Sequence, residues 1–423
     1  MFQPTLRLPR RAAAPAVALG ALLAAATARA ELIADFEAAV RAGHMRSAPS
    51  DTSTSHVEGQ PSLTLHFGSP RLVWRARYLF NGAYTFQGDG SNAYANLLEL
   101  NLAAQPTGRS TLTFAASASQ GSTFFRLSQR AVDAARPELR PAGDLSRVGA
   151  TALQAFSWEA APGLALGQML SFALDAPQDA LSRANRQGTL SLSADRVYPR
   201  DSFGALYTAR LAQLHPALAT DGSTVRTLSN SLQASWNRDL DQQWNGQITA
   251  GFEHVAGRDQ SSLHPVASLT MRYLAGVWTG AALLRHGASA NLEEGTMSLT
   301  DEVVLRASRI FEFLPQGNLS ASAGYLRSGP LRAAGAAAGT GTAISGDLGL
   351  TWTLWGPLQA SMRYTLSYQP ARGTSDAITT HILLGGVSYR YSTGEHTPTP
   401  VPTLGGRVDG GDAVRFPGEA RPQ

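Results

Sequence analysis

The chain contains no cysteine and no lysine, and few of its side chains carry charge. Of its 423 residues, 16% are charged and 43% are hydrophobic. Without cysteine it has no disulfide and no thiolate metal site. All 35 strongly basic side chains are therefore arginine, and the formal net charge is only +4. So small an excess of positive charge gives no reason to expect nucleic acid as a partner.

A run of about 18 apolar residues, the length that a membrane-spanning helix needs, is missing beyond the N-terminus. At the N-terminus, Arg7, Arg10 and Arg11 precede a short alanine-rich apolar segment, which ends at Ala28-Arg29-Ala30. A positive start, a short apolar core and a small-x-small site predict that residues 1–30 are a signal peptide. We therefore expect an exported protein of the periplasm, the cell exterior or the outer membrane.

What the chain has in abundance is alternation of apolar and polar side chains with a period of two, the pattern of β-strands. In the segment Leu358–Tyr368, leucine, alanine, methionine and tyrosine share one face, while Arg363 and polar side chains share the other. Its eleven residues match the length of a tilted strand that crosses a bilayer. Similar segments recur from Arg71 to Tyr391.

Short connections rich in glycine, proline and aspartate alternate with longer ones, as in bacterial outer-membrane barrels. We therefore predict an all-β fold, a transmembrane antiparallel up-and-down β-barrel over residues 61–391, with both termini in the periplasm. From Arg71 onward the pattern gives about 16 strands. Ser62–Phe67 also alternates, so 18 strands are the alternative if one more strand joins it. The final strand, Thr379–Tyr391, is expected to close the barrel on the strand that begins near Arg71.

Both flanks of the expected barrel lack this pattern. Residues 31–60 are predicted to form a periplasmic helix and leader, because Leu32, Phe36 and Val40 recur at helical spacing before Gly43 and a Ser/Thr/Pro-rich loop follows. Residues 392–423 are rich in glycine and proline, and we predict a disordered periplasmic tail that could reach export components of the periplasm.

The end of the last expected strand resembles the C-terminal assembly signal of Gram-negative outer-membrane β-barrel proteins. Gly386, Tyr389 and Tyr391 occupy its glycine and aromatic positions, whereas Leu384 stands where a polar residue is usual and the tail follows where the chain commonly ends. The resemblance is porin-like, without a specific family. It implies an outer-membrane location, insertion by the barrel-assembly machinery, and contact with outer-membrane lipid and lipopolysaccharide.

A barrel of this size leaves an aqueous lumen. Its expected lining is mostly serine, threonine, asparagine and glutamine, with charges of both signs. This mixture predicts a neutral or weakly anion-preferring pore, or a wall rigidified by ion pairs between strands. The charged candidates for the pore lining are Arg75, Arg77, Glu99, Asp195, Arg210, Glu253, Arg272, Glu302, Arg306, Asp347 and Arg363.

The longest connection, Gly121–Ser146, carries arginines that could constrict the pore if it folds inward; the alternative is a solvated surface loop. The candidate constriction residues are Arg126, Arg130, Arg136 and Arg140.

The nine histidines are scattered, with no hydrolase motif and no metal-ligand spacing, so we expect neither an enzyme nor a cofactor. The function that fits best is a water-filled channel for hydrophilic solutes. The alternatives are the outer-membrane pore of a polysaccharide export system, and a structural or adhesive barrel that transports nothing.

Overall fold

The computed structural model describes residues 31–48, 52–69, 71–86, 92–122, 146–215, 224–257, 261–292, 295–311, 316–331, 341–371 and 377–394. These residues form eighteen β-strands and one short 3-10 helix, η3 (Leu181–Arg183). No helix among them is long and apolar enough to cross a membrane.

The strands follow one another along the chain with no other repeating element between them. They are β1 (Glu31–Ala48), β2 (Thr52–Ser69), β3 (Leu72–Thr85), β4 (Asn92–Thr107), β5 (Ser110–Ser122), β6 (Ser146–Ala161), β7 (Leu164–Pro177), β8 (Asn185–Val197), β9 (Asp201–Leu214), β10 (Val225–Asp239), β11 (Trp244–Ala256), β12 (Ser261–Ala275), β13 (Trp278–Asn291), β14 (Thr296–Phe311), β15 (Gly317–Pro330), β16 (Gly341–Trp355), β17 (Leu358–Gln369) and β18 (Ile378–Ser392).

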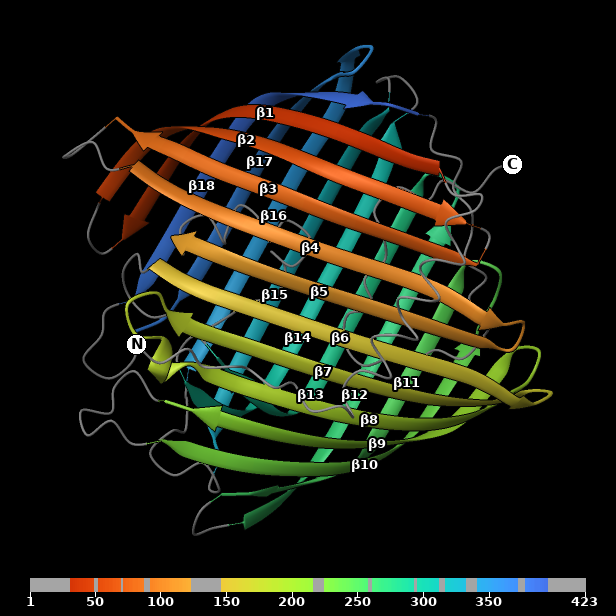
Figure 1. The fold of residues 1–423 in the computed structure, drawn as a ribbon. Helices are drawn as coiled ribbons and strands as arrows, with labels where there is room; N and C mark the ends of the chain where they lie inside the picture. Colours follow the sequence, from red (N-terminus) through yellow and green to blue (C-terminus); the bar gives the residue numbers. More distant parts are fainter. Residues whose placement is uncertain are drawn as a thin grey trace, which may run out of the picture.

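Each strand pairs antiparallel with its neighbour in sequence, and β18 pairs with β1 along fourteen residues, so the sheet closes on itself (Figure 1). Closure leaves no sheet edge along the seam between the first and last strands. The structure confirms the predicted all-β antiparallel up-and-down barrel, with the alternative count of 18 strands.

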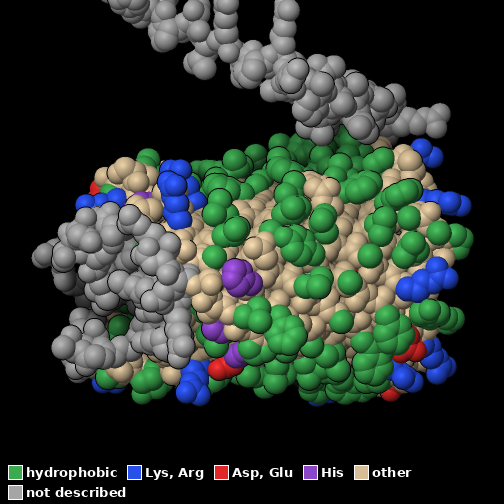
Figure 2. All heavy atoms as spheres, turned by 90° about the horizontal axis from the view of Figure 1, so that it is seen from below, with side chains coloured by type: hydrophobic (Ala, Val, Ile, Leu, Met, Phe, Trp, Pro, Cys, Tyr) green, Lys and Arg blue, Asp and Glu red, His purple; other side chains and the backbone are tan. Residues whose placement is uncertain are grey.

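Side chains alternate between the two faces of the barrel wall. Large apolar side chains occupy every second position on the outside, as Leu32, Phe36 and Val40 do on β1 and Leu383 and Val387 do on β18. Polar side chains occupy the positions between them and face inward. Figure 2 shows one outer face, where hydrophobic side chains cover the middle and arginines gather toward the ends. An apolar band between two polar ends is the surface of a membrane-spanning barrel.

The two ends of the barrel differ in their connections. At one end the strands are joined by two to five residues, whereas at the other end the connections reach 23 residues. All seven tryptophans of the chain lie near the short-turn end of their strands: Trp74, Trp158, Trp236, Trp244, Trp278, Trp352 and Trp355. Tryptophan prefers the membrane–water interface, and short turns mark the periplasmic side of bacterial barrels. This end is therefore the periplasmic one.

The main expectation of 16 strands and an N-terminal helix is wrong, because residues 31–48 form strand β1. The four-residue spacing of Leu32, Phe36 and Val40 suits a helix, but it is also a multiple of two, so in a strand all three point outward. Gly43 does not end a helix. A Cβ atom there would lie 2.5 Å from the His56 ring and from Leu384, so glycine permits close packing across the seam.

The expected leader loop is wrong as well. Most of residues 48–60 belong to β1 and β2, and their polar side chains face inward at alternate positions, as His56, Glu58 and Gln60 do. The expected partner of the closing strand is therefore also wrong: β18 pairs with β1 and not with β3, because β1 and β2 lie between them in the sheet. Two added strands preserve the even count. The start of β1 and the end of β18 therefore both lie on the short-turn side, as expected. The predicted signal peptide and residues 395–423 of the predicted tail lie outside the described residues.

Gly386 lies on the closing strand where β18 approaches β1 most tightly. A Cβ atom there would stand 2.3 Å from the Val40 carbonyl oxygen and 2.8 Å from the Arg41 Cα. Because both atoms belong to the backbone, they can yield only if the seam shifts. We expect Gly386→Val to lower the free energy of unfolding by about 1–3 kcal/mol, measured by urea titration in detergent micelles.

Gly385 provides the matched control for this prediction. It is the neighbouring glycine on β18, and a Cβ atom there would meet nothing within 4 Å. Gly385→Val should leave the urea midpoint nearly unchanged. Equal destabilisation by the two substitutions would contradict a packing role specific to Gly386.

Candidate functional site

The inner face of the barrel carries rows of hydroxyl groups that bond to each other across neighbouring strands. Thr111 and Ser157 approach within 2.6 Å, and Ser117 and Thr151 within 2.7 Å. The same arrangement recurs farther round the wall in Ser191–Thr208, Thr249–Ser268 and Thr279–Ser308. Hydroxyl groups donate and accept, so this lining can hydrogen-bond either water or a polar solute.

Several of the predicted lining charges meet as ion pairs on the inner face. Arg77 and Glu99 stand directly opposite each other on β3 and β4, 3.7 Å apart. Arg363 donates to Asp347 at 2.5 Å, and the Thr365 hydroxyl donates to the same carboxylate at 2.9 Å. Such cross-strand pairs fix the charges against the wall, so the field that they present to the lumen is partly cancelled.

The remaining predicted lining charges occupy inward positions too. Asp195 faces Gly204 on β9, where a Cβ atom would lie 1.9 Å from a carboxylate oxygen, so glycine makes room for the acid. Arg272 lies opposite Asn245, and Glu302 lies opposite Arg285. Arg306 lies opposite Ala281. These side chains are spread round the wall and are not gathered into one cluster.

A charged group near the periplasmic end was missed because β1 was read as a helix. Asp35 on β1 accepts from His66 at 3.1 Å and from Arg390 at 3.0 Å. Arg75 and Arg77 lie on β3, beyond β2, and Glu37 lies opposite Arg390, so charges of both signs meet here. The signal that could have found Asp35 is its parity: it lies one residue before Phe36, on the other face of the same strand.

The upper part of the β13–β14 hairpin leaves the wall and folds inward. β12 pairs with β13 only as far as His286, although β12 continues upward to Ser261 and β13 to Asn291. Pro265 lies on β12 just where the pairing is lost, and a proline has no N–H to donate to a neighbouring strand. Residues 287–291 and 296–300 therefore pair with each other but not with β12, and 298–300 keep their partner on β15; these two stretches are called the inward hairpin below.

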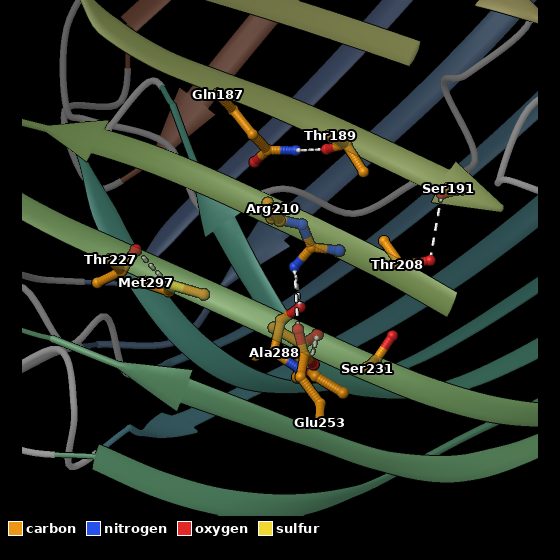
Figure 3. Close-up of polar contacts among 12 residues, drawn as sticks. Gln187, Thr189, Ser191, Thr208, Arg210, Thr227, Ser231, Glu253, Ala288 and Met297 are labelled. Atoms are coloured by element: carbon orange, nitrogen blue, oxygen red, sulfur yellow. Dashed lines mark hydrogen bonds and ion pairs between the residues drawn. The ribbon is translucent and has the colours of Figure 1, made fainter. Parts of the chain in front are cut away.

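Arg210 and Glu253 fasten the inward hairpin to the wall at β9 and β11 (Figure 3). The Arg210 guanidinium on β9 donates to the Ala288 carbonyl oxygen at 2.8 Å, and the Ala288 N–H donates to the Glu253 carboxylate on β11 at 3.1 Å. The two side chains also face each other at 3.5 Å. Together they satisfy both backbone polar groups of Ala288, which lost a partner when β13 left β12.

A small apolar core lies between the inward hairpin and the wall. Its buried members come from β9, β11, β13, β14 and the end of β15, and they are Ala212, Leu214, Val255, Ala288, Met297 and Leu331. The Thr227 hydroxyl also contacts the Met297 sulfur at 3.1 Å (Figure 3). Full burial of side chains such as Leu214 and Met297 contributes roughly 1.5–3 kcal/mol each, so this packing holds the hairpin in the lumen.

From the sequence, residues 287–295 are expected to form one of the longer connections between strands. The alternation of side chains on β13 continues through Ala288 and Ala290, which would face lipid if the strand stayed in the wall. Both side chains are small, and this small size is the local sign in the sequence that they pack against protein. The candidate constriction residues in the longest connection, Arg126, Arg130, Arg136 and Arg140, lie outside the described residues.

Arg147 and Asp175 form a second ion pair that the sequence did not reveal. Their side chains are 4% and 7% exposed, and the Arg147 Nε donates to the carboxylate at 2.6 Å, joining β6 to β7. Both strands have apolar residues on each face, so their inward positions were hard to recognise. Among the described residues, no three histidine, aspartate or glutamate side chains are grouped so that they could hold a metal ion.

No protein-family model and no curated protein matches the chain. Solved structures of proteins from Pseudomonas aeruginosa and Acinetobacter baumannii are among those that resemble it. The outer membrane protein OpdK of Pseudomonas aeruginosa is 11% identical, with 85% of this chain and 98% of that chain covered and a TM-score of 0.42. OccK2 (OpdF) of the same species is 13% identical, with 86% and 98% covered and a TM-score of 0.45. OccAB2 of Acinetobacter baumannii is 8% identical, with 85% and 98% covered and a TM-score of 0.43.

The chain's own geometry defines its class. A closed antiparallel sheet of 18 strands, apolar outside and polar inside, is the architecture of an outer-membrane β-barrel protein.

Proposed function

We propose that the protein forms a water-filled channel through which hydrophilic solutes cross the outer membrane. The observation that carries this proposal is the polar inner face of a barrel with 18 strands. Barrels of 16 to 18 strands are wide enough to hold an aqueous channel. The hydroxyl rows and paired charges would replace part of a solute's hydration shell as it passes.

Because the inward hairpin occupies part of the lumen, it favours small solutes over polymers as the transported molecules. It covers the inner side of β9–β11 with an apolar core that has no place in an open, uniformly wide tube. A wide pore for a polysaccharide is therefore the weaker alternative. A closed structural or adhesive barrel would make the ordered polar lining unnecessary.

The lining favours little selectivity between anions and cations. Near the periplasmic end, Arg75, Arg77 and Arg390 are balanced by Asp35, Glu37 and Glu99, and Glu37 lies directly opposite Arg390. Elsewhere the wall charges are largely paired, so any preference should be small.

We further propose that Gly386, Tyr389 and Tyr391 serve as the signal for the barrel-assembly machinery. Both tyrosines point outward at the periplasmic end of β18 and are accessible from outside the barrel, being 44% and 56% exposed. Gly386 lies at the seam that must close last, since β18 is the final strand to be made.

Planar-bilayer recordings test the channel directly. We expect purified protein to give discrete conductance steps, and a reversal potential close to zero in a potassium chloride gradient. The double substitution Arg75→Gln with Arg77→Gln should shift that potential toward cations. Arg327→Gln changes an outward-facing arginine on β15 and serves as the control that leaves the potential unchanged. Correctly folded protein that gives no conductance steps would refute the channel and favour the structural barrel.

A further inference from the structure

Two glutamines on neighbouring strands point away from the lumen. Gln154 on β6 lies opposite Leu170 on β7, and Gln168 on β7 lies opposite Phe156 on β6. Both belong to the outward rows of the wall, in which Leu170 and Trp158 are exposed. Trp158 marks the periplasmic interface, and Gln154 lies four residues above it. Because a tilted strand rises about 2.6 Å per residue along the barrel axis, Gln154 lies about 10 Å inside the apolar band.

Other outward amides of the wall have a partner on the next strand. The Tyr78 hydroxyl donates to Asn96 at 2.7 Å, and the Tyr207 hydroxyl donates to Asn230 at 2.9 Å. In contrast, no hydrogen bond joins the side chain of Gln154 or Gln168 to any residue that the structure describes. Hydrocarbon offers an amide neither a donor nor an acceptor, so these two positions are unfavourable against lipid alone. They favour a partner protein at this part of the wall.

The outer surface beside the glutamines is uneven. Among the described residues, no large apolar side chain of β5 is exposed, and Trp158 is the exposed one of β6. On β7, Leu170 and Phe172 are each 45% exposed and form a ridge. A trough lies beside the ridge, and its floor consists of paired outward alanines of β5 and β6, namely Ala116, Ala118, Ala150 and Ala152.

A second copy of this chain fits that shape. Barrels in one membrane share one orientation, so a two-fold axis between two copies runs along the membrane normal, and residues of similar height meet. Phe172 lies opposite Ala152, and paired residues on tilted strands differ in height by about 3 Å. The ridge of each copy therefore meets the trough of the other. Small side chains in the trough allow the two walls to approach closely.

The glutamines lie where this axis passes. β6 lies between the middle of the trough and the ridge on β7, so Gln154 falls near the axis and meets its counterpart in the second copy. A carboxamide both donates and accepts hydrogen bonds, so two copies of one glutamine satisfy each other. This self-complementarity favours a second copy over an unrelated protein.

We infer that the outer face of β5, β6 and β7 binds a second copy of this chain, forming a two-fold dimer in the membrane with Gln154 and Gln168 at its centre. The inference concerns the outer wall and does not depend on solute transport, because neither glutamine faces the lumen.

Cysteine cross-linking in intact outer membranes tests the contact directly. The chain has no cysteine, so a single introduced thiol reports on one position. We expect Gln154→Cys to form a disulfide-linked dimer under mild oxidation, because two copies of this position meet at the axis. Leu348→Cys is the matched control: it lies outward on β16, four residues from Trp352 and nearly opposite β6 in the closed sheet, and should stay monomeric.

Native mass spectrometry in detergent measures how strongly the copies associate. The double substitution Gln154→Leu with Gln168→Leu should raise the dissociation constant of the dimer at least about tenfold, because the central hydrogen bonds are lost. Ala152→Trp should abolish the dimer by filling the trough. Ala323→Trp adds the same side chain to an outward alanine of β15 and should leave the dimer unchanged. Heat-dependent mobility on detergent gels shows that each variant is folded.

The inference is overturned if folded wild-type protein is monomeric at every concentration tested, or if it contains three copies. Equal cross-linking of Gln154→Cys and Leu348→Cys would overturn it as well, as would cross-linking of Gln154→Cys to a protein of different mass. So would a double leucine variant that dimerises like the wild type. Conductance recorded on the same variants keeps the two proposals apart, since a dimer that does not conduct refutes the channel and leaves the interface standing.

Discussion

Shortening the inward hairpin should raise the single-channel conductance by roughly twofold or more, because the hairpin occupies part of the lumen. Replacing residues 290–297 with Asn-Gly leaves Ser289 paired with Ser298 around a two-residue turn, which suits a β-hairpin. The change removes Met297 from the apolar core beside β9 and β11 but leaves the membrane wall below intact. Single-channel recording in planar bilayers measures the effect.

Two point substitutions test whether the contacts of Arg210 and Glu253 with Ala288 are needed to hold the hairpin in place during conduction. Glu253→Gln removes the charge that faces Arg210 and weakens the bond from the Ala288 N–H. We expect more frequent transitions between conductance levels, because the hairpin is held less firmly. Asp301→Asn alters the outward face of the wall just below the hairpin, where Asp301 contacts His286 at 2.7 Å, and should leave conductance unchanged. A shortened variant that folds but conducts like the wild type would show that the hairpin does not narrow the pore.

Asp175→Asn should destabilise the barrel by about 3–5 kcal/mol, because it leaves the Arg147 charge buried without its carboxylate. Both side chains of this pair are at least nine-tenths buried, so water cannot easily replace the lost partner. Urea unfolding of the protein in lipid vesicles, followed by tryptophan fluorescence, measures the loss.

The Arg77–Glu99 pair is the comparison for that loss. Its side chains are 28% and 34% exposed, so Glu99→Gln should cost no more than about 1 kcal/mol. The double variant Arg147→Met with Asp175→Leu should regain much of the stability lost in Asp175→Asn, since no unpaired charge remains buried. Similar losses for Asp175→Asn and Glu99→Gln would indicate that the lumen solvates both sites equally.

Much of the fold could be predicted from the sequence because the period-two pattern is local. Each strand shows which of its faces is apolar, and the alternation of short and long connections shows that strands run up and down. The same parity predicted that Arg77, Glu99 and Arg363 face the lumen. The pattern failed to identify β1 and β2 as strands. The spacing of Leu32, Phe36 and Val40 fits a helix as well as a strand, and polar residues such as those of 48–60 are also typical of loops.

The site was less predictable because it depends on contacts between distant residues. Arg210 and Glu253 were identified as lining residues from their parity, but nothing near either one indicates that both bind Ala288. Arg210 lies 78 positions before Ala288 in the chain. Pro265 is a local sign that a neighbour is lost, yet it does not say where the freed strand goes.

By itself, the sequence determined that this protein is a closed β-barrel with an apolar outside, a polar inside and an even number of strands, because alternation fixes the two faces of each strand and the connections fix its direction. Only the tertiary structure decided that β18 closes on β1 and that the end of the β13–β14 hairpin lies within the lumen. These features depend on register and packing between strands far apart in the chain, which a local pattern does not specify.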